Sequence, residues 1–210
     1  MKNIINLPCN DNDISNLKTG DIFYLSGTLF TGRDEVHRRV VEENIMPPVD
    51  LKNAAIYHAG PIVKKNGENF DLVSIGPTSS IRMEKWAADF IKKTGVKIMI
   101  GKGGMGEKTA ATCREYGAVH CVYPGGCAVL GASQIEKIEN CLWPEFGMAE
   151  CLWVMRARSK ASSTRSKASS TRSKASSARS EASSIRNEAA LMFGPLIVSI
   201  DTRGHNLFTN

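Results

Sequence analysis

The sequence lacks three features that would assign its class at once. It contains no run of about 18 apolar residues, the length that marks a transmembrane helix. Residues 1–8 carry too short an apolar stretch for a secretory signal peptide. The six cysteines never show the C-x2-C spacing of zinc and ferredoxin-type sites. We therefore expect a cytoplasmic chain with free thiols, no membrane span, and no metal or cofactor of its own.

The excess of positive charge is confined to one segment. The chain carries 27 Lys and Arg residues against 21 Asp and Glu, which gives a formal net charge of +6. Residues 156–188 hold nine of the cations and two of the acids, so this segment carries +7 and the remainder carries −1. Binding to nucleic acid through net charge would therefore have to come from this segment.

The basic segment is also repetitive. Residues 158–186 repeat every seven residues, beginning with the unit R-S-K-A-S-S-T. A coiled coil has this period, but a seam of Ala with Ser or Thr buries too little apolar surface to offset the ordering entropy. We interpret 156–190 as a solvated, disordered, low-complexity insert in a domain made of 1–155 and 191–210. The alternative is a nucleic-acid or surface-binding protein that acts through the repeat, although no aromatic side chains are interleaved to stack on bases.

Outside the insert, strand and helix patterns alternate, which predicts an α/β domain with a mixed sheet. The Asn66-Gly67 pair between two apolar stretches predicts a hairpin, and Gly95 is expected to end a helix. The runs at 151–155 and 193–201, which flank the insert, are expected to be neighbouring strands. Further strands are predicted at 20–26, 54–59, 96–100 and 118–123, and helices after 31–34, 76–80 and 101–106 and near 133–139.

Three loops share one design, in which a strand is followed by glycine, a cation or hydroxyl, and then a helix. They contain Arg33, then Thr78 with Arg82, and Lys102. Such loops line the ligand crevice of α/β sheets, and helix N-termini add positive potential there. Because Arg can hold a carboxylate with two parallel hydrogen bonds, the three cations together predict a site for a small dicarboxylate.

The loop that contains Lys102 also resembles a phosphate-binding loop through its Gly101-x4-Gly106 spacing. The residue that follows is Glu107, where such a loop needs its lysine. A carboxylate at that position would lie beside the anion, which argues against a nucleoside triphosphatase.

Two histidines could belong to the same site. His37 lies one helical turn after Arg33 and is a candidate general acid or base, and His58 could line the same crevice. His120 lies in an apolar strand and is expected to be a hydrogen-bonded core residue. His205 is expected to lie in a turn.

Several separated motifs resemble one known family, that of the beta subunits of L(+)-tartrate dehydratases and the C-terminal domains of class I, iron–sulfur fumarases. The resemblance covers about residues 1–155 and 191–208, and two stretches, 58–67 and 124–130, look like the tartrate branch. The motifs that carry it are GDIFYLSGTL at 20–29, TGRDEVHRR at 31–39, HAGPIVKKNG at 58–67, GPTSSIRM at 76–83, GKGGMG at 101–106 and FGPLIVSID at 193–201.

The resemblance implies a swivelling β/β/α domain and an alpha subunit that carries a [4Fe–4S] cluster, the two chains forming a heterotetramer. It implies dehydration of L(+)-tartrate to oxaloacetate, with hydration of fumarate to malate as the alternative, and the open iron acting as a Lewis acid. Arg33, Arg82 and Lys102 would bind the dicarboxylate substrate. Thr78 would be the catalytic base, and His37 a second proton-transfer candidate. The resemblance implies neither a nucleic-acid partner nor a membrane.

Overall fold

The computed structural model describes residues 3–159 and 192–209. Residues 160–191, which include most of the insert expected at 156–190, lie outside the described residues. The strands are β1 (Asn3–Leu7), β2 (Ile22–Thr31), β3 (Ala55–Tyr57), β4 (Ile62–Asn66), β5 (Asn69–Ser74), β6 (Ile98–Gly101), β7 (Val119–Val122), β8 (Ile135–Leu142), β9 (Leu152–Ala157) and β10 (Phe193–Ile200). The helices are α1 (Asp11–Ser15), α2 (Asp34–Val41), α3 (Glu84–Thr94), α4 (Glu107–Tyr116) and α5 (Ala128–Ser133), with 3-10 turns η1 (Ser80–Met83) and η2 (Pro144–Phe146).

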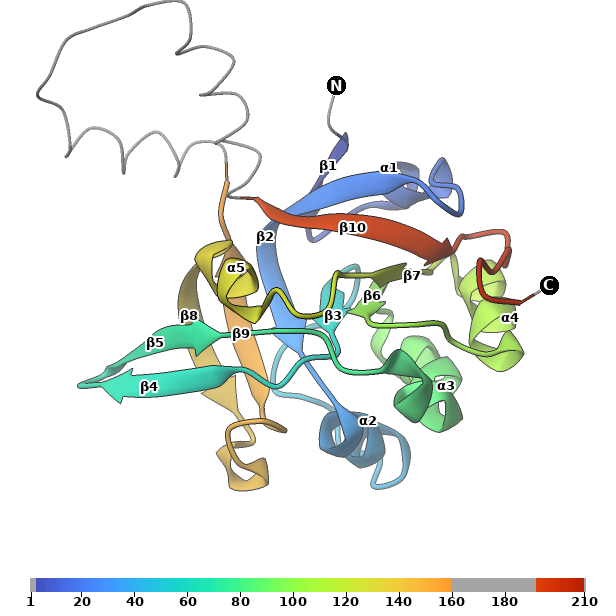
Figure 1. Cartoon of the computed structure of the whole chain (residues 1–210). Helices are drawn as coiled ribbons and strands as arrows, with labels where there is room; N and C mark the ends of the chain where they lie inside the picture. Colours follow the sequence, from blue (N-terminus) through green and yellow to red (C-terminus); the bar gives the residue numbers. More distant parts are fainter. Residues whose placement is uncertain (1–2, 160–191, 210) are drawn as a thin grey trace, which may run out of the picture.

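Five strands of the main sheet pair in a closed ring (Figure 1). Strands β2, β3, β6 and β7 are parallel neighbours in that order. Strand β10 closes the ring, because it runs antiparallel to both β7 and β2. Strand β1 pairs in parallel with β2, and β9 and β8 extend the sheet in antiparallel fashion. The predicted α/β class and mixed sheet are confirmed.

The two strands that flank the insert meet end to end on β2. Ala157, at the end of β9, pairs with Gly27, whereas Phe193, at the start of β10, pairs with Leu25. The expectation that these two strands lie side by side is therefore wrong, since each pairs with β2 and they do not pair with each other. The chain leaves and re-enters the sheet at almost the same point, a geometry that accommodates an insertion.

The prediction of a helix near 133–139 is also wrong. Helix α5 ends at Ser133, and the next residues form β8, which pairs with β9. Ile135 and Ile138 are spaced three apart, as in a helix, yet both lie in β8, whose register shifts between 135 and 137 and again between 138 and 140. These irregularities break the two-residue alternation by which a strand is recognised.

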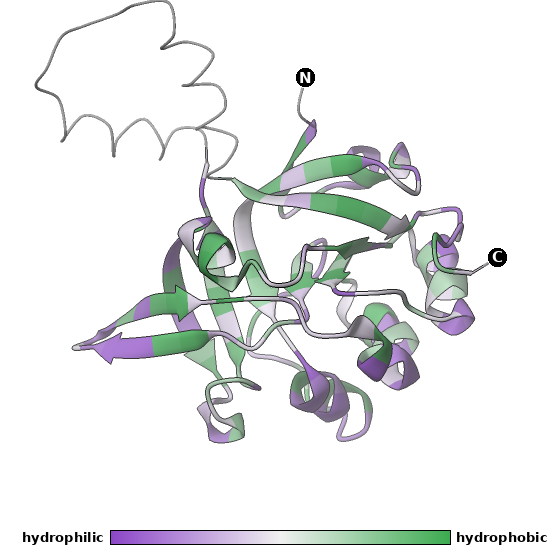
Figure 2. Cartoon of the chain, in the orientation of Figure 1, coloured by the Kyte–Doolittle hydropathy of each residue, from purple (hydrophilic) through white to green (hydrophobic). Residues whose placement is uncertain are grey.

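Apolar residues fill both faces of the sheet (Figure 2). Ile56 packs in one cluster and its neighbour Tyr57 in the other, as alternation along a strand requires. Helices α2, α3 and α4 cover the face that contains Ile56 and contribute Val36, Phe90 and other side chains to it. Among the described residues, no helix is long and apolar enough to cross a membrane.

Local signals in the sequence explain where individual elements end. Gly95 ends α3 with φ of +68°, in the left-handed region that favours glycine, as predicted. Strands β4 and β5 form the predicted hairpin around Asn66-Gly67.

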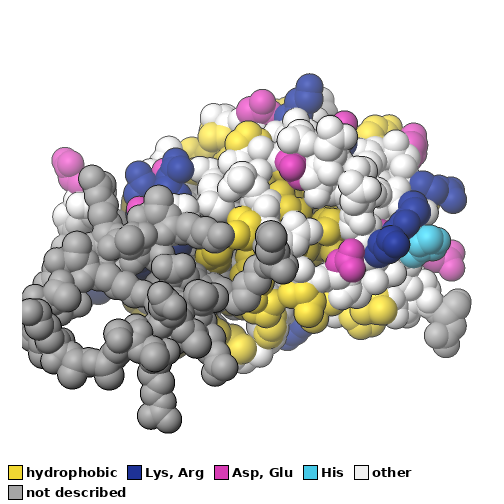
Figure 3. Space-filling model, turned by 90° about the horizontal axis from the view of Figure 1, so that it is seen from above, with side chains coloured by type: hydrophobic (Ala, Val, Ile, Leu, Met, Phe, Trp, Pro, Cys, Tyr) yellow, Lys and Arg dark blue, Asp and Glu magenta, His cyan; other side chains and the backbone are white. Residues whose placement is uncertain are grey.

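Seen from above, the surface shows apolar side chains in the middle and basic and acidic side chains interspersed around them (Figure 3). This face of the described residues thus shows both signs of charge rather than a uniform basic field.

Candidate functional site

The candidate site lies where the parallel strands end. The carboxyl ends of β2, β3, β6 and β7 meet at one edge of the ring, and each is followed by a loop. The loop after β5 joins them through a backbone hydrogen bond from Thr78 N to His58 O of 2.7 Å. This edge is the usual position of a ligand crevice in α/β sheets.

The loops of Thr78 and Lys102 are bound to each other through their backbones. Lys102 N donates to Thr78 O over 3.0 Å, and Ser80 N donates to Lys102 O over 3.0 Å. The predicted convergence of these two loops is thus observed, since the two hydrogen bonds form a short parallel bridge between Ser79 and Lys102.

Arg82 connects the Thr78 loop to the start of α2. Its Nη1 donates to the Thr78 hydroxyl over 3.3 Å, and its Nη2 lies 2.5 Å from Asp34 Oδ2. Asp34 follows Arg33 directly, so the three predicted loops form one contiguous surface. The guanidinium stabilises negative charge on the threonine oxygen, because it donates a charge-assisted hydrogen bond to that oxygen.

The three predicted cations differ in their carboxylate partners. Arg33 Nη2 pairs with Glu150 Oε1 at 2.9 Å, and Arg82 pairs with Asp34. Lys102 is exposed, and within residues 3–159 and 192–209 it has no carboxylate partner. Lys102 is therefore the cation most readily available to an incoming anion. The carboxylate partners Asp34 and Glu150 were missed from the sequence, because ion pairs across loops leave no local pattern.

His37 lies beneath this surface rather than on it. It is fully buried, its ring stacks on Phe90 with 4.2 Å between centroids, and its Nδ1 lies 2.8 Å from Arg33 O. Burial lowers the pKa of His37 to about 4, and its hydrogen bond to Arg33 O and the charge of Asp34 only partly oppose this. A titration near the ordinary value of ~6.5 is therefore not expected for this histidine. The structure links His37 to Arg33 through the backbone of Arg33.

His58 and His120 are also buried and neutral. Burial, together with the nearby His37 and His120, holds the pKa of His58 well below its usual range, and burial lowers the pKa of His120 to about 3. Ser80 Oγ lies 3.0 Å from His58 Nδ1 and 2.9 Å from His120 Nε2. The core role expected for His120 is confirmed, whereas Ser80 was not singled out from the sequence.

The start of α4 is already occupied by a carboxylate of the chain itself. Gly106 N donates to Glu84 Oε2 over 2.8 Å, and the Thr109 hydroxyl donates to the same oxygen over 2.6 Å. These are the donors that a phosphate group would need at a helix N-terminus. The argument against a nucleoside triphosphatase is thereby strengthened.

The described residues do not fit a metal cluster. No three His, Cys, Asp or Glu side chains among them come together in a group that could hold a metal ion. The six cysteines are free thiols, and the pair Cys141 and Cys151 has its sulfurs 3.4 Å apart. Two thiols are fewer than the ligands that an iron–sulfur cluster requires.

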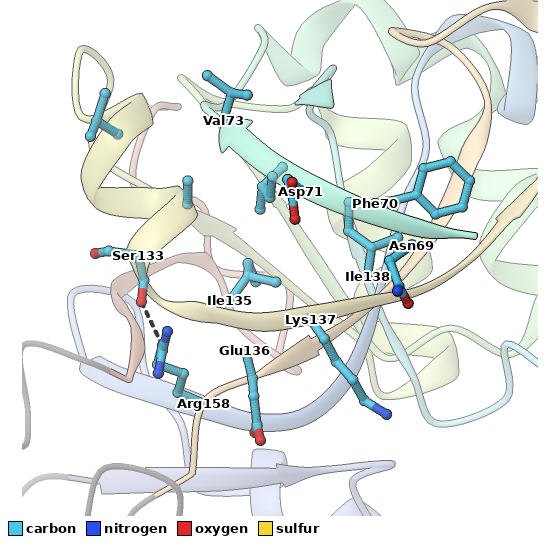
Figure 4. Close-up of a pocket in the computed structure, with 13 residues that line it drawn as sticks. Asn69, Phe70, Asp71, Val73, Ser133, Ile135, Glu136, Lys137, Ile138 and Arg158 are labelled. Carbon is cyan, nitrogen blue, oxygen red and sulfur yellow. Dashed lines mark hydrogen bonds between the residues drawn. The ribbon is translucent and has the colours of Figure 1, made fainter. Parts of the chain in front are cut away.

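A groove on the surface lies away from the candidate site. It is a groove of about 590 Å³ between β5, α5 and β8, lined by Asp71, Lys137 and others (Figure 4). At one end Arg158 Nε donates to Ser133 O over 2.7 Å. Since none of the candidate residues lines this groove, its size does not make it the reactive site.

Comparison with known proteins places the chain in a family. Residues 2–161 match the family described as fumarase C-terminus. The chain belongs to the fumarase C-terminus family. The L(+)-tartrate dehydratase subunit beta of Escherichia coli (strain K12) is 44% identical over 207 residues, which cover 99% of this chain and 87% of that protein. A putative L(+)-tartrate dehydratase subunit beta of Methanocaldococcus jannaschii is 36% identical over 200 residues, covering 93% and 86%.

A third relative is a longer protein. The putative fumarate hydratase class I of Geobacillus stearothermophilus is 39% identical over 153 residues, which cover 72% of this chain but 29% of that protein. The family resemblance predicted from the motifs is confirmed. These relatives are named as hydro-lyases, and the words "subunit beta" in two of the names imply a partner subunit for those proteins. Arg33, Thr78, Arg82 and Lys102 all lie inside the segment that defines the family.

Proposed function

We propose that this chain is the beta subunit of a cytoplasmic hydro-lyase that removes water from L(+)-tartrate to give oxaloacetate. The observation that carries the proposal is the joining of the Thr78 and Lys102 loops, with Arg82 bonded to the threonine hydroxyl. Together with Arg33, these residues present three cations and one activated hydroxyl at the same edge. The likeness to two proteins named as tartrate dehydratase beta subunits supports tartrate as the substrate.

The cations would hold the two carboxylates of the substrate. Lys102 would take up one carboxylate directly, because it has no carboxylate partner among the described residues. Arg33 and Arg82 would share their guanidinium groups between the substrate and Glu150 or Asp34, since a guanidinium has five N–H donors. These contacts fix the carbon skeleton against the Thr78 hydroxyl.

Thr78 would accept the proton that leaves carbon. A threonine hydroxyl is a weak base unaided and needs a neighbour that stabilises its anionic form. Arg82 Nη1, 3.3 Å from Thr78 Oγ1, is such a neighbour, and the charge of Lys102 on the bridged loop acts in the same direction. His37 would act as an orienter of the Arg33 loop, since its ring bonds to Arg33 O and has no exposed surface.

The proposal includes a partner. An alpha subunit would carry a [4Fe–4S] cluster, and the two chains would form a heterotetramer in which this chain is a swivelling β/β/α domain. The thiol arrangement of the described residues supports this division of labour, because at most two thiols come together.

Fumarate hydratase is the second candidate function. It is favoured by the 39% identity to a protein named as a putative class I fumarate hydratase. Malate and tartrate differ by one hydroxyl group, and the same three cations would hold either dicarboxylate.

Co-expression with the alpha-type subunit under anaerobic conditions tests the proposal. The purified complex should dehydrate tartrate faster than malate, and the chain alone should turn over neither substrate. Faster turnover of malate and fumarate would select the second function. A cluster that survives desalting on this chain alone and supports dehydration would refute the two-subunit proposal.

A further inference from the structure

Three buried histidines lie directly under the candidate site, and we call His37, His58 and His120 the histidine layer. The rings of His37 and His58 are 5.2 Å apart, and those of His58 and His120 are 6.3 Å apart. All three are fully buried. Buried imidazoles need hydrogen-bond partners, and those partners decide which ring nitrogen carries the proton.

Ser199 of strand β10 determines which groups donate and which accept hydrogen bonds in the histidine layer. Ser199 Oγ lies 3.1 Å from His120 O, which can only accept, so the Ser199 hydroxyl donates there. The contact of 2.5 Å between Ser199 Oγ and His120 Nδ1 is then a bond donated by His120. His120 therefore carries its proton on Nδ1 and leaves Nε2 as an acceptor.

The same direction continues through Ser80. Its hydroxyl donates to His120 Nε2, so its oxygen accepts from the Nδ1–H group of His58. The Nε2 atom of His58 then carries a lone pair and has no partner among the described residues. In the opposite arrangement, Ser199 would donate to His120 Nδ1 and Ser80 would donate to His58 Nδ1. The hydrogen bond from Ser199 to His120 O would then be lost, and an N–H group on His58 Nε2 would be buried without a partner, which costs more free energy.

His37 and His58 bond directly to loops of the site, and His120 is linked to them through Ser80. His37 donates through Nδ1 to Arg33 O, and His58 O accepts from Thr78 N. Ser80 bonds to the Lys102 loop through its backbone and to the layer through its side chain. The space is tight, since a Cβ on Gly101 would lie 1.9 Å from Ser80 Oγ. Glycine is therefore required directly before Lys102.

We propose that Ser80 is a positioning residue that holds the Thr78 and Lys102 loops in register by bonding to two histidines whose protons both lie on Nδ1. The expected effect of Ser80 on catalysis rests on the proposed function, whereas its role in holding the loops does not. The layer is neutral and buried, so it exchanges no proton with the substrate. It sets the distance between the hydroxyl of one loop and the cation of the other.

Nitrogen-15 spectra of the histidine rings in the full chain provide the first test. At pH 7 we expect His37, His58 and His120 to carry their protons on Nδ1. In the Ser199→Ala variant both directions make equal numbers of hydrogen bonds, so His58 and His120 should each show a mixture of the two tautomers. A proton on His58 Nε2 in the unaltered chain would overturn the proposal.

Hydrogen exchange of backbone amides provides the second test, and it needs no activity. In Ser80→Ala the backbone amides of position 80 and of Lys102 should exchange at least about tenfold faster, because local opening becomes easier. Ser26→Ala, which removes a buried hydroxyl in the middle of β2, is the matched control and should leave both amides unchanged. Equal exchange in the two variants would refute the positioning role.

Kinetics of the assembled complex separate the inference from the proposed function. If the unaltered complex dehydrates tartrate, Ser80→Ala should lower kcat by about ten- to a hundredfold, and Ser26→Ala should not. An unaltered complex without turnover would reject the proposed function, whereas the tautomer and exchange results would still decide whether Ser80 holds the loops. Full kcat in Ser80→Ala would reject Ser80 as a positioning residue.

Discussion

Arg33 Nη2 lies 2.9 Å from Glu150 Oε1, so a guanidinium proposed to bind the substrate already holds a carboxylate of its own chain. The pair is largely shielded from solvent, with side-chain exposures of 20% and 21%. A dianionic substrate that reaches Arg33 therefore meets the negative charge of Glu150 as well. This relationship leads to the first prediction.

Glu150→Gln should lower KM for the dicarboxylate by about fivefold with little change in kcat. The amide oxygen can still accept from Arg33, while removal of one negative charge near the substrate is worth about 1 kcal/mol. Steady-state kinetics would measure this, with Glu145→Gln as the control, since Glu145 pairs with Arg39 outside the site. A rise in KM would mean instead that the charge of Glu150 is needed to orient Arg33.

Lys102→Ala and Arg82→Ala should each lower kcat/KM by about tenfold to a hundredfold. Each change removes a charge-assisted hydrogen bond to a carboxylate, worth roughly 1.5–3 kcal/mol. Lys108→Ala is the matched control, because Lys108 lies on α4 and pairs with Asp89 at the surface. Unchanged kinetics of Lys102→Ala in a correctly assembled complex would show that Lys102 is an ordinary solvated surface residue.

Thr78→Ala should lower kcat by about 10²–10⁴ with little change in KM, because the carboxylates remain bound while the proton acceptor is lost. Thr78→Ser keeps the hydroxyl near Arg82 and should retain most of the activity. His37→Asn should have the smaller effect on kcat. The reverse order of the two losses would exchange the roles that we propose for Thr78 and His37.

Much of the fold follows from the sequence because its signals are local. The turn at Asn66-Gly67 and the end of α3 at Gly95 depend on a few adjacent residues. A helix was predicted near 133–139, but most of this stretch belongs to β8, in which two shifts in register interrupt the two-residue alternation of a strand. The ring closed by β10 could not be predicted, since it depends on pairings between residues more than 150 positions apart.

The sequence predicted that the candidate loops would converge, but not the contacts that their side chains make. The loops that contain Thr78 and Lys102 converge as expected, but only the Lys102 loop follows a strand of the parallel set. The Thr78 loop follows the hairpin strand β5 and joins the edge through backbone hydrogen bonds. The burial of His37 was not predictable from its position one turn after Arg33. It depends on Phe90, which comes from a helix about fifty residues later in the chain.

The histidine layer should make the fold sensitive to acid. The folded-state pKa values of His37 (about 4), His120 (about 3) and His58 (well below normal) are all depressed, so unfolding below pH ~6.5 takes up protons. Stability from these groups is present in full well above ~6.5 and falls as the pH drops toward 4, with a slope that approaches about 4 kcal/mol per pH unit once the unfolded chain binds all three protons. Denaturant unfolding at pH 7, 6 and 5 would measure the slope. Equal stability at the three pH values would contradict this prediction.

Replacement of residues 159–191 by a short glycine–serine linker should leave the melting temperature and dehydratase activity of the complex unchanged. The residues that flank the insert pair with Gly27 and Leu25, two positions apart on β2, so a short link can connect them. Thermal unfolding and turnover of the shortened chain would check this. Loss of function without loss of folding would favour the alternative in which the repeat itself binds a nucleic acid or a surface.

The closed pairing of β2, β3, β6, β7 and β10 has a consequence for how a substrate could enter and leave. A ring of hydrogen-bonded strands offers no hinge, since tilting one member would break bonds to both of its neighbours. The loops that follow β2, β3, β6 and β7 are therefore all anchored to one ring of strands. In the two-subunit complex that we propose, an opening that admits a dicarboxylate would then occur at the boundary between this chain and the alpha subunit, and product release would be controlled there.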